Sequence, residues 1–564
     1  MKGVTDNHAS PFVKLKTVNY SDVKWEDGFW KDKFQLINKS SLPSMWQLFR
    51  DPSKLHAWQN FEIAAGSKKG KFRGTYWVDG DFYKCIEATC YVFSMTKDEH
   101  WGQILDEAID LISRAQQPDG YIHTPIIIGA GYFTEYDRDY YFEGIERWSS
   151  ILHHELYCMG HLFTSGCIHF RLTGKEQLLK VAIKCADYLY DHFILGKEDL
   201  LNFGFNPSQI MGLVELYRTT KNEKYLKLAQ VFLKNRGARP AKRYQYKTVE
   251  DLPFVIGGTD FTQDRTPFID EKEAKGHAVT GTYLWCGAAD IFAETGEEAI
   301  LKRLKYLWDD VVNRKMYITG GTGAVHRGIT NSGDFAQEMF GFPFELPNST
   351  AYNETCANIS NVMWGWRMLS ITGDAKYTDI MERVMYNNGL SGLSIDGCHY
   401  FYTNPMSQYH HSHQQIWDYK ERQEYIPCFC CPPSIARAIA SWQNYLYTIS
   451  KDALWINHYG NNFLSTILSN EPVKIDMKSN YPWDGKIILT FKEMPVGKFS
   501  VYLRIPSWVS NCKVNVNGKE TVENITRGSY FKIERYWHKD DTVEINMLMD
   551  VQFIITSVRL IYRS

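Results

Sequence analysis

The stretch "FRLTGKEQLL" (residues 170–179) decides the fold, because it joins two apolar helical runs through a short polar turn. Glycine after one helix and acidic residues that open the next are the usual stop and start signals of helices. The same arrangement recurs as "FSMTKDEHW" (93–101), "YRTTKNEKYL" (217–226), "AETGEEAIL" (293–301) and "SITGDAKYTD" (370–379). The sequence therefore contains a weak repeat of helical hairpins.

Repeated helical hairpins bury their apolar faces only against neighbouring hairpins, so they must stack or close on themselves. We predict a closed α/α toroid over residues 1–446, with an active-site cleft at the end where the connecting loops are long. Long connections usually carry function. Three of them are visible, at residues 116–144, 258–277 and 319–354.

The periodicity changes after residue 446. "KIILTFKEM" (486–494) and "FSVYLRIPSW" (499–508) alternate apolar and polar residues, and Asn517-Gly518 is a hairpin signal. We therefore predict a second domain over residues 447–564, an antiparallel β-sandwich that is shortened at its C-terminal end.

The bulk composition excludes several classes of partner. A formal charge of −2 without a basic run argues against nucleic acid and anionic membranes. The chain has 17 Trp, 35 Tyr and 31 Phe, and aromatic faces are common in sugar-binding clefts, which favours carbohydrate. The start "MKGVTDNHASPFVKLKTVNY" has no apolar signal region, and no window is long enough to span a membrane. We expect a soluble chain, cytoplasmic as written, or periplasmic or secreted if a signal peptide was removed.

The stretch "CFCCPPSIARA" (428–438) places three cysteines within four positions and restrains them with two prolines. A second segment, "AYNETCANISNVMWGWRML" (351–369), brings Glu354 and Cys356 to the start of another helix. With Cys430 and Cys431 these residues make a four-coordinate set that suits zinc. Two other interpretations stay open from spacing alone, namely a local disulfide and buried thiols without a ligand.

Further polar residues stand out by their context. Glu338 lies between aromatic residues, which predicts a pKa raised by desolvation, although a lone loop glutamate is usually solvated. His154 and His277 suit either sugar binding or a structural role. Asp81 and Asp119 have turn-like surroundings, so turn chemistry is the simplest interpretation of both.

Several motifs together resemble one family. "QEMFGFPFELPNSTAYNETCA", "GHAV", "HELY", "QQPDGY", "CFCCPPSIAR" and "YPWDG" occur in the order found in the DUF1680 group of glycoside hydrolases. These are β-L-arabinofuranosidase-like enzymes of glycoside hydrolase family 127, with family 146 closely related. The resemblance implies an (α/α)6 barrel followed by a β-sandwich. It also implies a retaining hydrolase whose nucleophile is a zinc-bound cysteine.

The same resemblance assigns roles to single residues. Cys430 is the expected nucleophile and Glu338 the expected acid/base, while zinc is bound by Glu354, Cys356, Cys430 and Cys431. The expected sugar-contacting residues are His154, Asn206, His277 and Tyr402. Asn206, in "FNPSQIM", replaces a histidine that is common in the family, and Thr280 replaces an arginine. These departures leave the reaction class intact and place the sugar specificity in question.

The implied function is a retaining exo-glycoside hydrolase that releases L-arabinofuranose from plant-type glycans. Its partner is an oligosaccharide or glycoside substrate, and a homodimer is an assembly that we keep open. Three alternatives also stay open: a relative that acts on another small or acidic L-sugar, a zinc hydrolase in which metal-bound water attacks, and a non-catalytic carbohydrate-binding relative stabilised by zinc.

Overall fold

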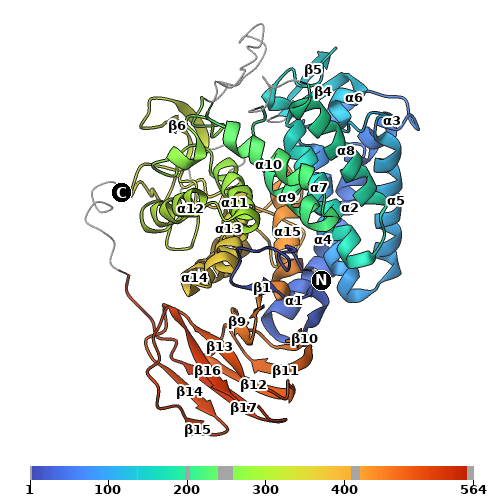
Figure 1. The fold of residues 1–564 in the computed structure, drawn as a ribbon. Helices are drawn as coiled ribbons and strands as arrows, with labels where there is room; N and C mark the ends of the chain where they lie inside the picture. Colours follow the sequence, from blue (N-terminus) through green and yellow to red (C-terminus); the bar gives the residue numbers. More distant parts are fainter. Residues whose placement is uncertain (1–2, 136–137, 197–202, 239–257, 408–419, 555–564) are drawn as a thin grey trace.

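The structure is a computed structural model that describes residues 3–135, 138–196, 203–238, 258–407 and 420–554. A helical part fills the upper half of Figure 1, and a part made of strands lies below it. Within the described ranges, six helices form an inner ring: α4 (Val78–Thr96), α7 (Glu155–Thr173), α9 (Ser208–Thr220), α11 (Ala278–Thr295), α13 (Thr355–Thr372) and α15 (Cys431–Ser441).

The inner ring is closed. Each inner helix packs against the next, and α15 packs back against α4, which begins more than 300 residues earlier in the chain. In Figure 1 the orange α15 accordingly lies among blue and green helices. The outer helices that cover the ring are α2 (Leu42–Arg50), α5 (Glu99–Ala115), α8 (Gln177–Ile194), α10 (Glu223–Asn235), α12 (Glu298–Asp310) and α14 (Ala375–Val384). This arrangement confirms the predicted α/α toroid.

The repeated turns mark the ends of the inner helices. Thr96, Thr173, Thr220, Thr295 and Thr372 are the last residues of α4, α7, α9, α11 and α13. Each hydroxyl donates to the backbone carbonyl four residues earlier, and its oxygen accepts from the backbone N–H two residues later. These two hydrogen bonds end the helix and begin the turn, which explains why the threonine recurs at this position.

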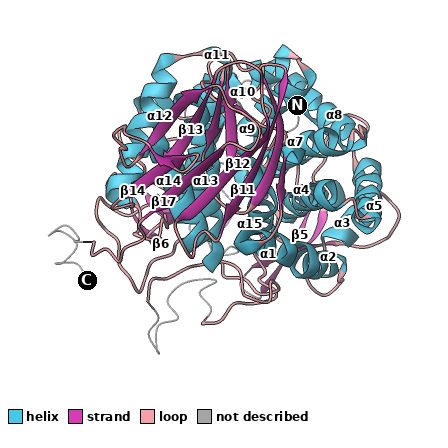
Figure 2. Ribbon diagram, turned by 90° about the horizontal axis from the view of Figure 1, so that it is seen from below, coloured by secondary structure: helices cyan, strands magenta, loops and turns pink. Residues whose placement is uncertain are grey.

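The strands form two facing sheets, seen from below in Figure 2. Their orders are β1-β8-β9-β13-β16 and β15-β14-β17-β12-β11-β10-β2. The strands are β1 (Lys16–Thr17), β2 (Val23–Trp25), β8 (Tyr447–Ser450), β9 (Ala453–Ile456), β10 (Asn462–Leu468), β11 (Glu471–Ser479), β12 (Lys486–Glu493), β13 (Phe499–Ile505), β14 (Cys512–Val516), β15 (Lys519–Glu520), β16 (Ser529–Arg535) and β17 (Thr542–Met547).

The sandwich contains both the expected hairpin and one unexpected pairing. Asn517 and Gly518 have φ values of 51° and 77° and join β14 to β15, as the hairpin signal predicted. The prediction of a purely antiparallel domain is wrong, because β9 and β13 pair in parallel. The chain crosses to the other sheet through β10, β11 and β12 before it returns, so β13 arrives in the same direction as β9.

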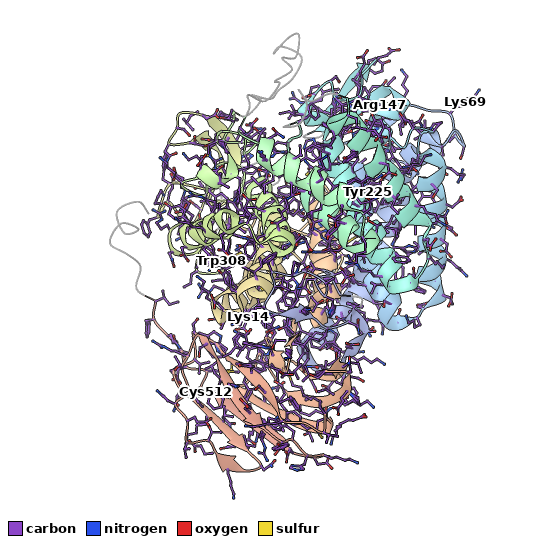
Figure 3. The ribbon with its side chains drawn as sticks, viewed as in Figure 1. Lys14, Lys69, Arg147, Tyr225, Trp308 and Cys512 are labelled. Carbon is purple, nitrogen blue, oxygen red and sulfur yellow. The ribbon has the colours of Figure 1, made fainter. Side chains whose placement is uncertain are left out.

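The N-terminal segment ties the two parts together. β1 and β2 belong to the two sheets of the sandwich although they precede the barrel in sequence, and the predicted domain boundaries stay a prediction. Lys14, labelled at the junction in Figure 3, places its ammonium 5.4 Å from the centre of the Trp455 ring. Arg504 of β13, fully buried, pairs with Asp379 and Glu382 of α14. The sandwich is thus fixed to the barrel wall by a buried ion pair.

Small strands lie at the other end of the barrel. The first group is β3 (Phe72–Gly74), β4 (Ala130–Glu135) and β5 (Arg138–Glu143), and the second is the hairpin of β6 (Val325–Ile329) and β7 (Phe335–Met339). Figure 1 shows β4, β5 and β6 at the top of the barrel, opposite the sandwich. β4, β5, β6 and β7 lie in two of the three long loops that the sequence predicted to be functional, whereas β3 precedes all three.

Candidate active site

Three cysteines and one glutamate meet where two inner helices begin. One ligand atom from each of Glu354, Cys356, Cys430 and Cys431 lies within 4.8 Å of the others. Glu354 Oε1 is 3.5 Å from the sulfur of Cys430 and 3.6 Å from that of Cys431, and the two sulfurs are 3.8 Å apart. Glu354 Oε2 is buried and has no hydrogen-bond partner. This set could hold a metal ion, and it matches the four residues that the resemblance assigned to zinc.

Both ligand pairs are presented by helix starts. Glu354 is the N-cap residue of α13, and Cys356 lies in the first turn of that helix. Cys430 is the N-cap residue of α15, and Cys431 opens the helix ahead of two prolines. Proline is tolerated in a first turn because the N–H it lacks would have no helical partner there. The backbone N–H groups and the dipole of each helix start favour anionic ligands at this place.

Burial opposes ionisation of the cluster. It raises the pKa of Cys356 to about 12, and it raises the pKa values of Cys430 and Cys431 further. Burial and the nearby Glu338 carboxylate together raise the pKa of Glu354 well above its ordinary value. A cation is therefore needed before these groups become anionic at neutral pH. Cys430 is 8% exposed and Cys431 is completely buried, so Cys430 is the more accessible of the two.

A second group of residues surrounds Glu338 on β7. The Nδ1 of His277 accepts from the backbone N–H of Val279 at 3.1 Å, so the ring proton lies on Nε2, which donates to Glu338 Oε2 at 3.2 Å. The Tyr402 hydroxyl donates to the same oxygen at 3.3 Å. One ligand atom from each of His277, Glu338 and Glu354 also lies within 4.8 Å of the others. Glu354 therefore connects the thiol cluster to Glu338.

The prediction that the pKa of Glu338 is raised is wrong when only the groups of the protein act on it. Burial does raise this pKa, but the neighbouring His277 and Glu354 outweigh it and lower the pKa to about 2. The sequence could not show this, because His277 is 61 positions away and opens the helix α11, whereas Glu338 lies on the strand β7. Glu338 also has a φ of 52°, a left-handed conformation that is uncommon for a residue with a side chain.

His154 and Asn206 complete the same end of the barrel. His154 is the N-cap residue of α7, and its Nδ1–H donates to the carbonyl of Leu152 at 2.6 Å, which leaves Nε2 as an acceptor. Its ring lies 5.1 Å from the Phe205 ring and 4.9 Å from the Trp77 ring. Asn206 is 6% exposed, and its Oδ1 has no hydrogen-bond partner. Buried polar atoms usually have partners, so this acceptor is suited to a ligand.

Two models of one protein family match the sequence of the chain. The model described as "Beta-L-arabinofuranosidase, GH127 catalytic domain" matches residues 22–444, and the model of the GH127 middle domain matches residues 453–549. The chain belongs to glycoside hydrolase family 127. It is thus a glycoside hydrolase, as the resemblance implied.

Individual members of family 127 agree with this assignment. The non-reducing end β-L-arabinofuranosidase of Bifidobacterium longum subsp. longum is 30% identical over 94% of this chain and 82% of its own length. The GH127 β-L-arabinofuranosidase of Geobacillus stearothermophilus T6 is 35% identical, with a TM-score of 0.85 over 95% of this chain and 83% of its own. A third solved structure, a GH127 β-arabinofuranosidase, is 31% identical with a TM-score of 0.81 over 96% of this chain and 81% of its own. These similarities confirm the barrel-and-sandwich architecture.

The predicted site residues are brought together, although their roles stay predictions. Cys430, Glu338, Glu354, Cys356 and Cys431 form one continuous group, and His277 and Tyr402 contact it through Glu338. His154 is linked to it through the ring of Phe205, which lies 5.5 Å from the His277 ring, and Asn206 follows Phe205 in the chain. Among the described residues, no helix is both long and apolar enough to cross a membrane.

Sequence reasoning missed a buried lysine beside the cluster. Asp81 was interpreted as turn chemistry, but it lies in the first turn of α4, fully buried, 3.0 Å from the ammonium of Lys84. The signal was available, because "DFYK" (81–84) places a carboxylate and an ammonium three residues apart inside an apolar helix. For Asp119 the turn interpretation holds, since its Oδ1 accepts from the backbone N–H of Tyr121 at 3.1 Å.

Proposed function

We propose that this glycoside hydrolase is a retaining, exo-acting β-L-arabinofuranosidase with Cys430 as nucleophile and Glu338 as acid/base. The observation that carries the proposal is the placement of Glu354 between these two residues. It is 3.5 Å from the sulfur of Cys430 and within 4.8 Å of a carboxylate oxygen of Glu338. A retaining glycosidase needs its two groups near one anomeric carbon, about 5–5.5 Å apart in enzymes with two carboxylates.

Zinc is the cation that fits the ligand set. A donor set of three sulfurs and one carboxylate oxygen binds zinc in preference to magnesium or calcium. Glu354 Oε2, which has no hydrogen-bond partner, offers a further lone pair. Glu354, Cys356, Cys430 and Cys431 would hold the ion. When bound there, zinc would keep the coordinating sulfurs as thiolates at neutral pH.

Cys430 and Glu338 then carry out the two steps of the reaction. The thiolate of Cys430 attacks the anomeric carbon, so a C–S bond forms while the glycosidic C–O bond breaks and Glu338 gives its proton to the leaving oxygen. In the second step Glu338 takes a proton from water, the water oxygen bonds to the anomeric carbon and the C–S bond breaks. An ionised Glu354 opposes ionisation of Glu338, since like charges this close disfavour each other. This repulsion favours the protonated form of Glu338, which the second step restores, until the next glycosidic bond is cleaved.

The remaining residues would hold the sugar. The free Oδ1 of Asn206 and Nε2 of His154 are acceptors, and both suit hydroxyl groups of a furanose ring. The family members named above act on β-L-arabinofuranosides or a β-arabinofuranoside, according to their descriptions, and this chain covers more than four fifths of each. The same chemistry supports L-arabinofuranose at the non-reducing end of a glycan as the substrate.

Two measurements test the proposal. Product analysis on a panel of L-arabinosides and plant-glycan oligosaccharides should show released L-arabinose with its anomeric configuration retained. An arabinofuranose that bears a haloacetamide group should label Cys430, and Cys430→Ser should lose the label while Cys428→Ser keeps it. A product with inverted anomeric configuration would overturn the assignment of Cys430. So would an active enzyme in which the probe labels a residue other than Cys430. Absence of turnover on the whole panel would favour a carbohydrate-binding protein.

A further inference from the structure

Lys84 is buried beneath the cysteine cluster. It projects from α4, its side chain is 0% exposed, and its ammonium donates to the backbone carbonyl of Cys430 at 2.9 Å. The same ammonium pairs with Asp81 at 3.0 Å and lies 5.5 Å from the centre of the Tyr157 ring. Lysine is almost never fully buried unless a specific partner compensates the cost. Here one of the partners is the loop that carries two metal ligands.

The ammonium is held between two polar partners, the Asp81 carboxylate at 3.0 Å and the Cys430 carbonyl at 2.9 Å. Arg437 also lies near Cys356, but its guanidinium is paired with Glu87 at 2.9 Å. Lys84 is therefore the buried cation whose hydrogen bond reaches the ligand loop itself.

The bond to the Cys430 carbonyl fixes two ligands at once. This oxygen belongs to the peptide that links Cys430 to Cys431, so holding it sets the direction in which both side chains leave the backbone. A set of three thiolates and one carboxylate carries four negative charges, which a divalent cation only half neutralises. A buried excess of negative charge is costly, so a fixed positive charge beside the set lowers that cost.

We propose that Lys84 is a positioning residue of the catalytic centre: its ammonium fixes the Cys430–Cys431 peptide and offsets part of the negative charge of the ligand set. Through this contact the cluster retains its cation and Cys430 keeps the orientation in which it attacks the sugar. The inference rests on the proposed thiolate–metal site and adds to it a group that does not touch the metal or the sugar. Partners of this kind are commonly worth 10- to 100-fold in metal affinity or activity.

The test compares the full-length chain with Lys84→Met, which keeps the length of the side chain and removes its charge and its donors. Zinc affinity is measured by competition with a chromophoric chelator, and the cobalt-substituted chain reports sulfur ligation through its charge-transfer absorption. We expect zinc affinity to fall about 10- to 100-fold, the cobalt spectrum to change, and kcat to fall with little change in KM. A folded Lys84→Met chain with unchanged zinc affinity and cobalt spectrum would overturn the inference.

Two further variants separate positioning from simple stability. Asp81→Asn keeps the ammonium and its bond to Cys430, so it should lower the unfolding temperature while zinc affinity stays within about threefold of wild type. Lys315→Met is the matched control, because Lys315 is also buried, donates to the Ala274 carbonyl at 2.5 Å and pairs with Glu273 at 3.2 Å. It should lose stability without losing zinc. Equal zinc loss in all three variants would reduce Lys84 to a packing role and overturn the proposal.

The wild-type chain separates this inference from the proposed function. If the wild type retains no zinc, the proposed function fails and the role of Lys84 fails with it. If the wild type retains zinc and Lys84→Met retains it equally well, only the role of Lys84 is overturned. Should Lys84→Met not fold, Asp81→Asn decides the matter, because a loss of zinc in that variant contradicts a role carried by the lysine alone.

Discussion

The two ends of the inner ring arrange buried charge in opposite ways. At the C-terminal ends of the helices, three guanidinium groups meet three carboxylates; the residues are Arg171, Arg218, Arg367, Glu215, Asp290 and Glu294. All of these side chains are nearly inaccessible. At the N-terminal ends, the cluster of Glu354 and three cysteines lies next to Glu338, and the Lys84 ammonium donates to the carbonyl of Cys430.

This difference shows which buried cluster needs something from outside the chain. The C-terminal network contains its own counter-charges, and Arg218 alone contacts Glu215, Asp290 and Glu294 at 2.6–2.8 Å. The charges of such a network balance without a ligand, which is typical of a structural role. The N-terminal cluster has more acidic groups than basic ones, so it can become anionic only with a bound cation. The uncompensated cluster is therefore the candidate metal site of the two.

The largest expected effect comes from removing a metal ligand. Cys356→Ala should lower the zinc content of the purified chain to near zero and reduce kcat/KM by on the order of 10⁴-fold, since the thiolate nucleophile loses its stabilising cation. Cys286→Ala, a buried thiol of α11 that is 3.8 Å from the Ser360 carbonyl, is the matched control and should keep its zinc. Zinc analysis by mass spectrometry reads out both. Full activity in zinc-free Cys356→Ala would contradict the inference that the cysteine cluster, unlike the arginine–carboxylate network, depends on a cation.

Removing the acid/base should have the next largest effect. Glu338→Gln should lower kcat by about 10²–10⁴-fold on substrates with poor leaving groups, because general acid catalysis contributes that much. The loss should be much smaller on an activated aryl glycoside, which leaves without a proton. Steady-state kinetics on the two substrate types measures the ratio. Glu345→Gln, in the same loop, should be neutral, and an equal loss on both substrates would contradict the role of Glu338.

Breaking the charge network at the C-terminal ends of the inner helices should lower stability and leave catalysis unchanged. Arg218→Met leaves three carboxylates without a shared partner and should lower the free energy of unfolding by about 3–5 kcal/mol. Zinc content and KM should remain those of the wild type. Arg114→Met removes an exposed pair with Asp110 and should cost below about 1 kcal/mol. Chemical denaturation measures both, and a loss of zinc in folded Arg218→Met would show that the two ends are coupled.

The same network predicts an acid-sensitive contribution to stability. Burial raises the pKa of Glu215, but Arg171 and Arg218 outweigh it and lower the pKa to about 2, from 4.5 in the unfolded chain. A depressed carboxyl pKa stabilises the folded state above pH 4.5, and this contribution disappears as the pH falls toward 2. Glu215→Gln should therefore flatten the dependence of unfolding free energy on pH between these values, by roughly 3 kcal/mol. An unchanged pH dependence in this variant would contradict the pairing.

The smallest expected effect concerns the sugar. Asn206→Ala removes an acceptor that has no partner within the chain, and it should raise KM about tenfold with a smaller change in kcat, as expected for one lost hydrogen bond to substrate. Asn206→His restores the residue common in the family and should change the preference among L-sugars. Kinetics on the arabinoside panel measures both variants. Equal KM values across the three chains would remove Asn206 from the pocket.

Much of the architecture could be predicted because it depends on local signals. The threonine turns ended inner helices as expected, and Asn517-Gly518 formed its hairpin, since both depend on backbone conformations that neighbouring residues dictate. The parallel pairing of β9 with β13 could not be predicted in this way. It depends on which sheet a strand joins after three intervening strands, and no local pattern carries that information.

The same distinction between local signals and tertiary structure applies to the site. The sequence by itself determined the ligand residue types, their positions at helix starts and the family, because these depend on short motifs and on capping chemistry. The tertiary structure alone decided that residues 354–356 meet residues 430–431, that His277 lowers the pKa of Glu338 and that Lys84 lies beneath the cluster. The physical reason is that electrostatic and hydrogen-bond energies depend on distance through space, which closure of the helical ring sets and sequence separation does not.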